Sequence, residues 1–489
     1  MHAAHEGTSE PVSLARRAVR GSLWAAIGAY GTFVVNFAGI AVLARYVSPA
    51  DFGSYALAQS YNEIVLAIGL FPFAQAVVQL GNLRAIGDTA LIMGVILRLA
   101  QLLLSVPLAF VVARYNGRTV GILFFLFALL AILDGLRSNM SAVMERNLHY
   151  RGMSIAKVAA GVAGSSLAVG AAILGFGSYA LVFREALVVA LVLAVYLVNA
   201  RRWNLPTGRS FDRATARHVW RFSKALFWVN SLERILARLD RVALGNLLGV
   251  EALGYFHQSK YLATLPQAAM APANMQVAIA TYTKVRDDPP RLARAFDVVQ
   301  YFVLRVVPLA GLAMVLFPEE ILRTMYGARW LPAAPTFRIL GIYATLLPIL
   351  EGYRTFSVAL EQWAALRWSI IAQAVVLVAA LAVLVPRYGA IGAAWATCIR
   401  PVVGFAILGR AVSRRIHPAT HGRVPPVLGA FAAALGGGWA LQQLVTAHGG
   451  TRMLLLKLGV ASFLYVLGLL IIERKGIFER VSYLRRAWR

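Results

Sequence analysis

The stretch 158–182, V-A-A-G-V-A-G-S-S-L-A-V-G-A-A-I-L-G-F-G-S-Y-A-L-V, contains no Lys, Arg, Asp or Glu. It exceeds the roughly 20 apolar residues that an α-helix needs to cross about 30 Å of hydrocarbon. Further charge-free stretches cover 370–386, 427–447 and 458–472. Of the 489 residues, 59% are hydrophobic and only 14% are charged, whereas about 25% of the residues in a soluble domain are charged. The sequence therefore excludes a water-soluble fold and predicts several membrane crossings.

Apolar runs separated by charge clusters or turn residues predict an all-α polytopic membrane protein with about fourteen transmembrane helices. The connections between these runs are too short to hold a separate folded domain, so we expect the function to lie between the helices. The predicted helices cover 22–44, 55–80, 89–112, 119–137, 158–176, 178–199, 222–244, 252–280, 298–317, 332–357, 366–385, 390–409, 426–446 and 453–472.

The net charge of +27 follows the loops between the predicted helices. With the N-terminus in the cytosol, 30 Lys and Arg residues fall on the cytosolic side and 8 on the opposite side. This asymmetry predicts that both termini are cytosolic, and it explains the positive charge without nucleic acid as a partner. The predicted organisation is a cytosolic tail (1–20), a six-helix half (21–200), a basic cytosolic linker (201–224), a second six-helix half (225–412), an extra helix pair (425–472) and an amphipathic cytosolic tail (473–489).

Ionisable residues inside the predicted spans indicate a polar interior. Ten basic and six acidic residues lie at membrane depth, so about four positive charges stay uncompensated even if every acid is paired. A basic residue at the bilayer centre costs on the order of 2.5–3.5 kcal/mol, which favours placing the surplus in a watery cavity or against an anionic ligand. The single cysteine, Cys398, excludes an internal disulfide. We predict no metal site, no cofactor and no catalytic residues.

The seventh predicted helix carries the sharpest motif. Asn230, Arg234, Arg238 and Arg241 lie at i, i+4, i+8 and i+11, which places them in one stripe of a helix. Three guanidinium groups on one face suit a multivalent phosphate. The alternative is that they bond carboxylates or carbonyls of neighbouring helices and hold the bundle together.

Other ionisable residues are candidates for binding or ion coupling. Glu63 stands without a nearby base in its own helix, so it either carries a proton or ion or meets a base across the bundle. Glu233 and Asp240 form an acidic line beside the arginine stripe. These three acids are the ion-coupling candidates. The further candidates for substrate binding are Arg98, Lys260 and Arg305.

A faint internal repeat appears when the chain is compared with itself at an offset near 200. Leu43 then matches Leu244, and Gly53 matches Gly254, within segments that share the same order of features. Two six-helix halves of the same orientation around a central cavity are a known plan of transporters. The repeat therefore predicts two pseudo-symmetric halves, with the C-terminal helix pair as an addition.

Five motifs in order resemble one family: R-G-S-L-W (20–24), L-A-R-Y-V-S-P-A-D-F-G-S-Y-A-L-A (43–58), E-R-N-L-H-Y-R (145–151), L-D-R-V-A-L-G-N-L-L-G-V-E-A-L-G-Y-F (239–256) and Y-G-A-R-W-L-P-A-A-P (326–335). They are similar to the oligosaccharide and polysaccharide flippases of the multidrug/oligosaccharidyl-lipid/polysaccharide exporter superfamily. The resemblance implies a flippase of the bacterial inner membrane that exports an undecaprenyl-pyrophosphate-linked oligosaccharide by alternating access. It also implies membrane lipids and other polysaccharide-assembly membrane proteins as partners.

Two other classes of protein share this hydropathy. A drug or cation antiporter of the same superfamily would prefer a cavity rich in acids and aromatics, which the surplus of interior arginine disfavours. A membrane glycan polymerase or ligase would carry a large outer loop, whereas the outer connections here are short. We therefore predict a transporter that is not an enzyme.

Overall fold

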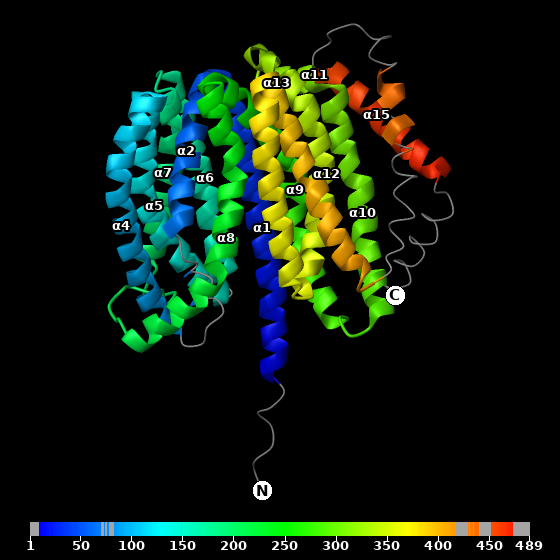
Figure 1. Cartoon of the computed structure of the whole chain (residues 1–489). Coiled ribbons are helices and arrows are strands. Elements are labelled where there is room, and N and C mark those ends of the chain that lie inside the picture. Colours follow the sequence, from blue (N-terminus) through cyan, green and yellow to red (C-terminus); the bar gives the residue numbers. More distant parts are fainter. Residues whose placement is uncertain are drawn as a thin grey trace. The chain divides into compact units, whose positions relative to one another are not determined.

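The computed structural model describes residues 9–69, 73, 76–77, 83–147, 149–416, 429, 431–433, 435–439 and 451–472. All the regular secondary structure in these ranges is helical, as the hydropathy predicts (Figure 1). The chain forms two compact units, Met1–Gly254 and Tyr255–Arg489. Each unit is described separately below.

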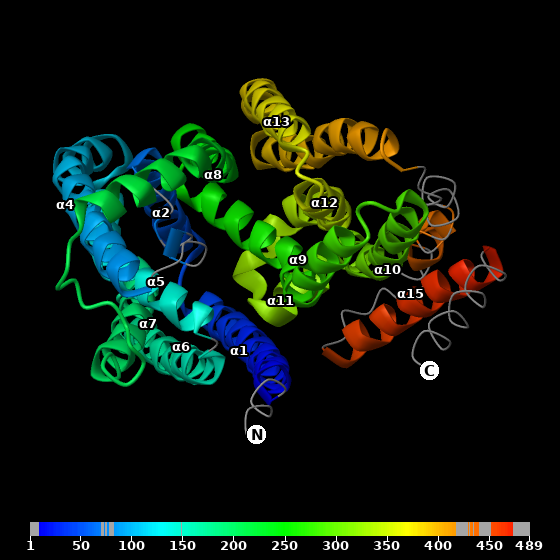
Figure 2. The same ribbon diagram turned by 90° about the horizontal axis from the view of Figure 1, so that it is seen from below.

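The first unit is a helix bundle in which α2 packs against α4, α5, α7 and α8. Figure 2 shows these helices from below. Helix α1 packs along α6, and α6 packs along α7. Buried apolar side chains such as Val143, Met144 and Tyr196 form the core of the bundle. The helices of this unit are α1 (Ser9–Tyr46), α2 (Pro49–Gly69), α4 (Leu83–Asn116), α5 (Arg118–Arg146), α6 (Tyr150–Ile173), α7 (Ser178–Val198) and α8 (Arg213–Leu247).

The second unit contains most of α9 and the elements that follow. Helix α12 packs between α10 and α13, around a core that includes Phe296 and Phe356. Helix α15 packs on α10 and α11, where Lys457 donates to Glu320 at 3.0 Å. The elements are α9 (Val250–Lys284), α10 (Pro289–Leu316), α11 (Pro318–Met325), η1 (Ala328–Ala333), α12 (Ala334–Ala359), α13 (Trp363–Ser413) and α15 (Thr451–Ile472).

The described helices confirm a protein that crosses the membrane many times. In the part of the chain that the structure describes, nine helices are long and apolar enough to span a bilayer. Helix α13 covers two predicted spans, 366–385 and 390–409, and is interrupted at Gly389, whose φ of 57° is non-helical. Most of the predicted helix 426–446 and the predicted tail 473–489 lie outside the described residues. The total of fourteen spans therefore stays a prediction.

Apolar side chains on the outside of the bundle fit a hydrocarbon environment. On α4, the side chains of Leu103 and Phe110 are both 74% exposed. Exposed apolar side chains of this size would be unfavourable in water. Proline interrupts the backbone hydrogen bonding inside α4 at Pro107, inside α10 at Pro308 and inside α12 at Pro348. Pro308 and Pro348 are buried, whereas Pro107 is exposed.

The two glycines matched by the internal repeat face each other in the first unit. A Cβ atom added at Gly53 would overlap the carbonyl group of Val250, and one added at Gly254 would overlap the carbonyl group of Pro49. The contact is reciprocal, because each glycine meets the backbone that begins the other's helix. Only glycine at both positions allows this approach of α2 and the start of α9.

Candidate functional site

A cavity of about 430 Å³ lies among the helices of the first unit. Six helices line it, and Arg98 enters it from near the middle of the long helix α4. The lining residues are Asn36 on α1; Gln59, Asn62, Glu63 and Leu66 on α2; Arg98 on α4; Phe127, Leu130, Ala131 and Asp134 on α5; Arg184, Glu185, Val188 and Val189 on α7; and Arg234 on α8.

Three arginines line the cavity without a carboxylate partner among the described residues. Arg98 is only 9% exposed, and its buried Nη1 atom has no hydrogen-bond partner in that part of the chain. Arg184 bonds neutral groups, since it donates to Asn36 Oδ1 at 2.6 Å and to Ser165 Oγ at 3.2 Å. Arg234 is exposed to the cavity. The cavity therefore offers positive charge that no direct ion pair neutralises.

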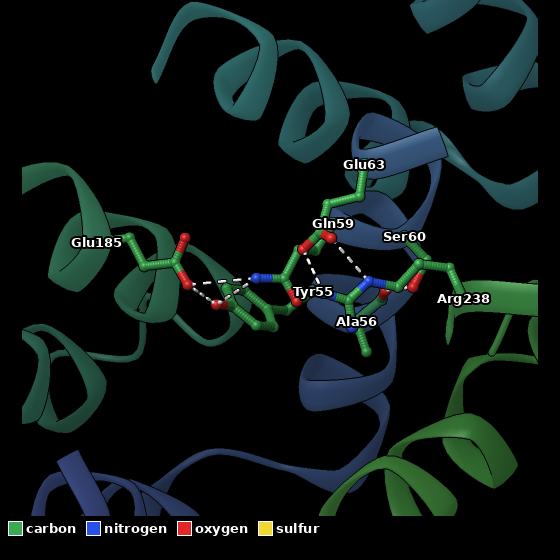
Figure 3. Close-up of polar contacts among 7 residues, drawn as sticks. All are labelled: Tyr55, Ala56, Gln59, Ser60, Glu63, Glu185 and Arg238. Carbon is green, nitrogen blue, oxygen red and sulfur yellow. Dashed lines mark hydrogen bonds and ion pairs between the residues drawn. The ribbon is translucent and has the colours of Figure 1, made fainter. Parts of the chain in front are cut away.

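Two of the three acids in the lining are already paired with an arginine. Arg238 donates to both carboxylate oxygens of Glu63, at 2.5 and 2.9 Å (Figure 3). Asp134 accepts two hydrogen bonds from Arg137, at 2.5 and 2.9 Å. Glu63 thus meets a base across the bundle, and its role in ion coupling stays a prediction. The two ion pairs leave Glu63 and Asp134 with little unbalanced negative charge to offset the three arginines.

The third acid, Glu185, has neutral hydrogen-bond partners. It accepts a hydrogen bond from the Tyr55 hydroxyl, and Gln59 Nε2 lies 3.4 Å from the same carboxylate oxygen (Figure 3). Tyr55, Gln59 and Glu63 are spaced four residues apart on α2, so they share one helical face. Glu185 of α7 and Arg238 of α8 therefore contact the same face of α2.

The sequence held signals for site residues that the prediction missed. Arg184 and Glu185 are the only charged residues in α7, so two adjacent ionisable side chains in an otherwise apolar helix mark a polar contact. The four-residue spacing of Tyr55, Gln59 and Glu63 is a polar stripe in an apolar helix. No such signal distinguishes Asn36, which acquires its role only because Arg184 reaches α1.

The three arginines of the predicted stripe on α8 have different surroundings in the structure. Arg234 lines the cavity, whereas Arg238 is bonded to Glu63. Arg241 is not in the cavity lining, and its buried Nε atom has no hydrogen-bond partner among the described residues. Asn230 lies on the same helix, but its side chain is outside the described part of the structure.

The remaining predicted residues lie elsewhere. Glu233 and Asp240 do not line the cavity, and Asp240 is 1% exposed and accepts the backbone N–H of Arg241 at 2.8 Å. Lys260 and Arg305 belong to the second unit, where Arg305 lies 3.4 Å above the centre of the Tyr301 ring. Of the predicted binding residues, the structure thus brings Arg98 and Arg234 together in one cavity.

A polar cluster joins α2 to the C-terminal ends of α4 and α8. The Tyr61 hydroxyl lies 3.1 Å from Asn116 Oδ1, and Asn246 Nδ2 donates to the Tyr61 hydroxyl at 2.7 Å. Asn116 Nδ2 donates to Asn246 Oδ1 at 2.9 Å. By the charge asymmetry of the loops, these helix ends lie on the predicted outer side of the membrane.

Known proteins resemble this chain over most of its length. A family described as polysaccharide biosynthesis protein matches residues 42–335. The succinoglycan biosynthesis transport protein ExoT of Rhizobium meliloti (strain 1021) is 23% identical over 98% of this chain and 97% of its own length. The teichuronic acid biosynthesis protein TuaB of Bacillus subtilis (strain 168) is 20% identical over 69% of this chain and 70% of its own.

Solved structures share the fold at low sequence identity. The lipid II flippase MurJ, in an inward closed conformation, has a TM-score of 0.73 at 13% identity, and the match covers 93% of this chain and all of that one. An inward-facing multidrug resistance transporter of the MATE family has a TM-score of 0.55 at 17% identity, covering 81% of this chain and 94% of that one. These structures confirm the polytopic helical fold, and the relative named a transport protein agrees with the prediction of a transporter.

Proposed function

The chain belongs to the polysaccharide biosynthesis protein family, and from that membership and the cavity we propose that it flips an undecaprenyl-pyrophosphate-linked oligosaccharide. The substrate moves from the inner to the outer leaflet of a bacterial inner membrane by alternating access. The observation that carries the proposal is the group of three arginines, Arg98, Arg184 and Arg234, which line one cavity without a carboxylate partner among the described residues.

The chemistry of such a substrate matches the lining. A pyrophosphate cannot enter hydrocarbon without replacing its hydration, and guanidinium groups do this with charge-assisted, bidentate hydrogen bonds. The amides of Asn36, Gln59 and Asn62 lie beside the arginines and can exchange hydrogen bonds with sugar hydroxyls. The prenyl chain stays in the surrounding lipid, where it needs no polar partner.

The ion pair of Glu63 with Arg238 gives a route to ion coupling. Glu63 lines the cavity and Arg238 does not, so a diphosphate bound beside Glu63 draws Arg238 toward the cavity and releases the carboxylate, which can then accept a proton. Glu63 is the coupling candidate that this proposal favours, because Glu233 and Asp240 lie outside the cavity lining. The membrane potential can also act on the charge that the substrate carries.

We propose that the cluster of Tyr61, Asn116 and Asn246 closes the cavity on the outer side of the membrane. Its three side chains come from three helices and can separate without breaking a helix. Hydrogen bonds between membrane helices contribute only about 0.6 kcal/mol each on average, so the cluster can open and close within a transport cycle.

Export in cells tests the proposal. A strain lacking the gene is complemented with the wild type or with the double variant Arg98→Gln, Arg234→Gln, and the labelled lipid-linked oligosaccharide is assayed for reaction with impermeant periodate. We expect the double variant to lower outer-leaflet exposure at least tenfold, because hydrogen bonds to charged groups contribute about 1.5–3 kcal/mol each.

The matched control is Arg114→Gln, which removes a charge from the exposed end of α4, away from the cavity. It should leave export unchanged. Membrane abundance and the elution profile of the purified variants show whether the double variant has folded. Normal export by a folded double variant would exclude the cavity as the site of the pyrophosphate.

A further inference from the structure

The start of α8 presents a face of exposed cationic side chains. Arg213, Arg217, Arg221 and Lys224 occupy an arc of about 80° on this helix, and all four side chains are exposed. Trp220 lies about 20° beyond the edge of this arc, next to Arg213 in projection, and is 42% exposed. None of the four cationic groups forms an ion pair or hydrogen bond with the residues that the structure describes.

The opposite face of this segment is already used by the bundle. Val219 and Ser223 are fully buried, and Phe222 packs against the apolar core of the first unit. Figure 1 shows the start of α8 beside the lower end of α4, with which it is in contact. The basic face therefore points away from the core of the first unit, at the end of the bundle where the predicted spans 89–112 and 222–244 begin.

The loop before α8 is held in place rather than free. Asp88, near the start of α4, accepts hydrogen bonds from the backbone N–H groups of Thr207 at 2.7 Å and Gly208 at 2.9 Å. The Ser210 hydroxyl donates to its second oxygen at 2.9 Å. This anchor fixes the position of Arg209, whose side chain is exposed beside the start of α8.

The helix start itself is capped by Asp212. Its carboxylate accepts the backbone N–H of Thr215 at 2.7 Å and also bonds the Thr215 hydroxyl, and these hydrogen bonds lower the pKa of Asp212. The carboxylate thus stays ionised and engaged with the helix end. Next to it, Phe211 is 51% exposed, so a second aromatic ring accompanies Trp220 at this boundary.

We propose that this surface, which we call the α8 basic face and define as Arg213, Arg217, Arg221, Lys224 and Trp220, binds the headgroups of anionic phospholipids. Arginine forks match phosphate oxygens, and tryptophan favours the boundary between headgroups and hydrocarbon. A basic residue near an anionic membrane surface contributes about 1 kcal/mol. The proposal rests on the membrane-spanning fold and is independent of the transported substrate.

Fluorescence quenching in vesicles tests this binding at one residue. The full chain is reconstituted in phosphatidylcholine with a minor fraction of brominated phosphatidylglycerol or, separately, of brominated phosphatidylcholine. The signal of Trp220 is obtained as the difference between the wild type and Trp220→Phe. We expect brominated phosphatidylglycerol to quench Trp220 more strongly, and we expect added salt to reduce this preference because it screens the charges.

The triple variant Arg213→Gln, Arg217→Gln, Arg221→Gln should abolish the preference, with the apparent affinity falling about fivefold for each charge removed. The control Arg114→Gln, Arg118→Gln removes two exposed charges from the other end of the same unit and should leave it intact. Equal quenching by both lipids, or an unchanged triple variant, would overturn the proposal. Loss of the preference in millimolar inorganic phosphate at constant ionic strength would also overturn it, in favour of a free phosphate ligand.

Failure of this test is distinct from failure of the flippase proposal. Quenching reports lipid contact without any transport, and both leaflets of the vesicle carry the brominated lipid. A protein that exports normally but shows no lipid preference would refute only the α8 basic face as a headgroup site.

Discussion

The ion pair between Glu63 and Arg238 should couple α2 to α8 energetically. Arg238 donates to both carboxylate oxygens, and the two side chains are only 21% and 23% exposed. Charges about 4 Å apart attract by about 4 kcal/mol at an effective dielectric constant of 20. Desolvation offsets part of this attraction, whereas removing one partner leaves the other charge half-buried, which costs about 3–5 kcal/mol in a dry interior.

Because the pair adjoins a cavity, we expect the cost of removing one partner to be smaller than that in a dry interior. Glu63→Gln and Arg238→Gln should each lower the free energy of unfolding by about 2 kcal/mol, and the double variant should lose about 2 kcal/mol in total. The coupling energy is then about 2 kcal/mol. The measurement is a double-mutant cycle on the purified protein in mixed micelles, unfolded with dodecyl sulfate and followed by circular dichroism.

A second ion pair in the same chain provides the control. Glu351 and Arg354 lie three residues apart on α12, 3.8 Å from each other and 30% and 39% exposed. Their coupling should stay below about 0.5 kcal/mol, as for other exposed pairs within a helix. Additive effects of the Glu63 and Arg238 substitutions would refute the reasoning, because they would mean that the bidentate geometry contributes no coupling between the helices.

Two further predictions concern backbone contacts. Gly254→Ala should destabilise the protein by about 1–3 kcal/mol in the same assay, because its Cβ would overlap the Pro49 carbonyl; Gly170→Ala, where no atom lies within 4 Å, should be neutral. Asp88→Ala should release the loop before α8 and raise trypsin cleavage after Arg209 several-fold, whereas Asp287→Ala, at a carboxylate that is 95% exposed, should not. Each prediction would be contradicted if its variant and its own control had equal effects.

The sequence alone was sufficient for the helical membrane fold. The apolar length of a segment and the charge of its loops are sufficient to determine whether that segment spans the bilayer. The helices α4, α5, α6 and α7 therefore appear near their predicted positions. Contacts within one helix are equally accessible, because residues three apart lie on the same side of a helix, as in the ion pairs of Asp134 with Arg137 and of Glu351 with Arg354. Family membership also followed from linear motifs.

The binding cavity required the tertiary structure. Glu63 and Arg238 are separated by 175 residues in the chain, and Asn36 and Arg184 by 148. Periodicity places Arg234 and Arg238 on one face of α8, but it contains no information on which helix lies opposite each of them. Their different roles, one open to the cavity and one bonded to a carboxylate, arise from the lateral packing of helices that are distant in sequence.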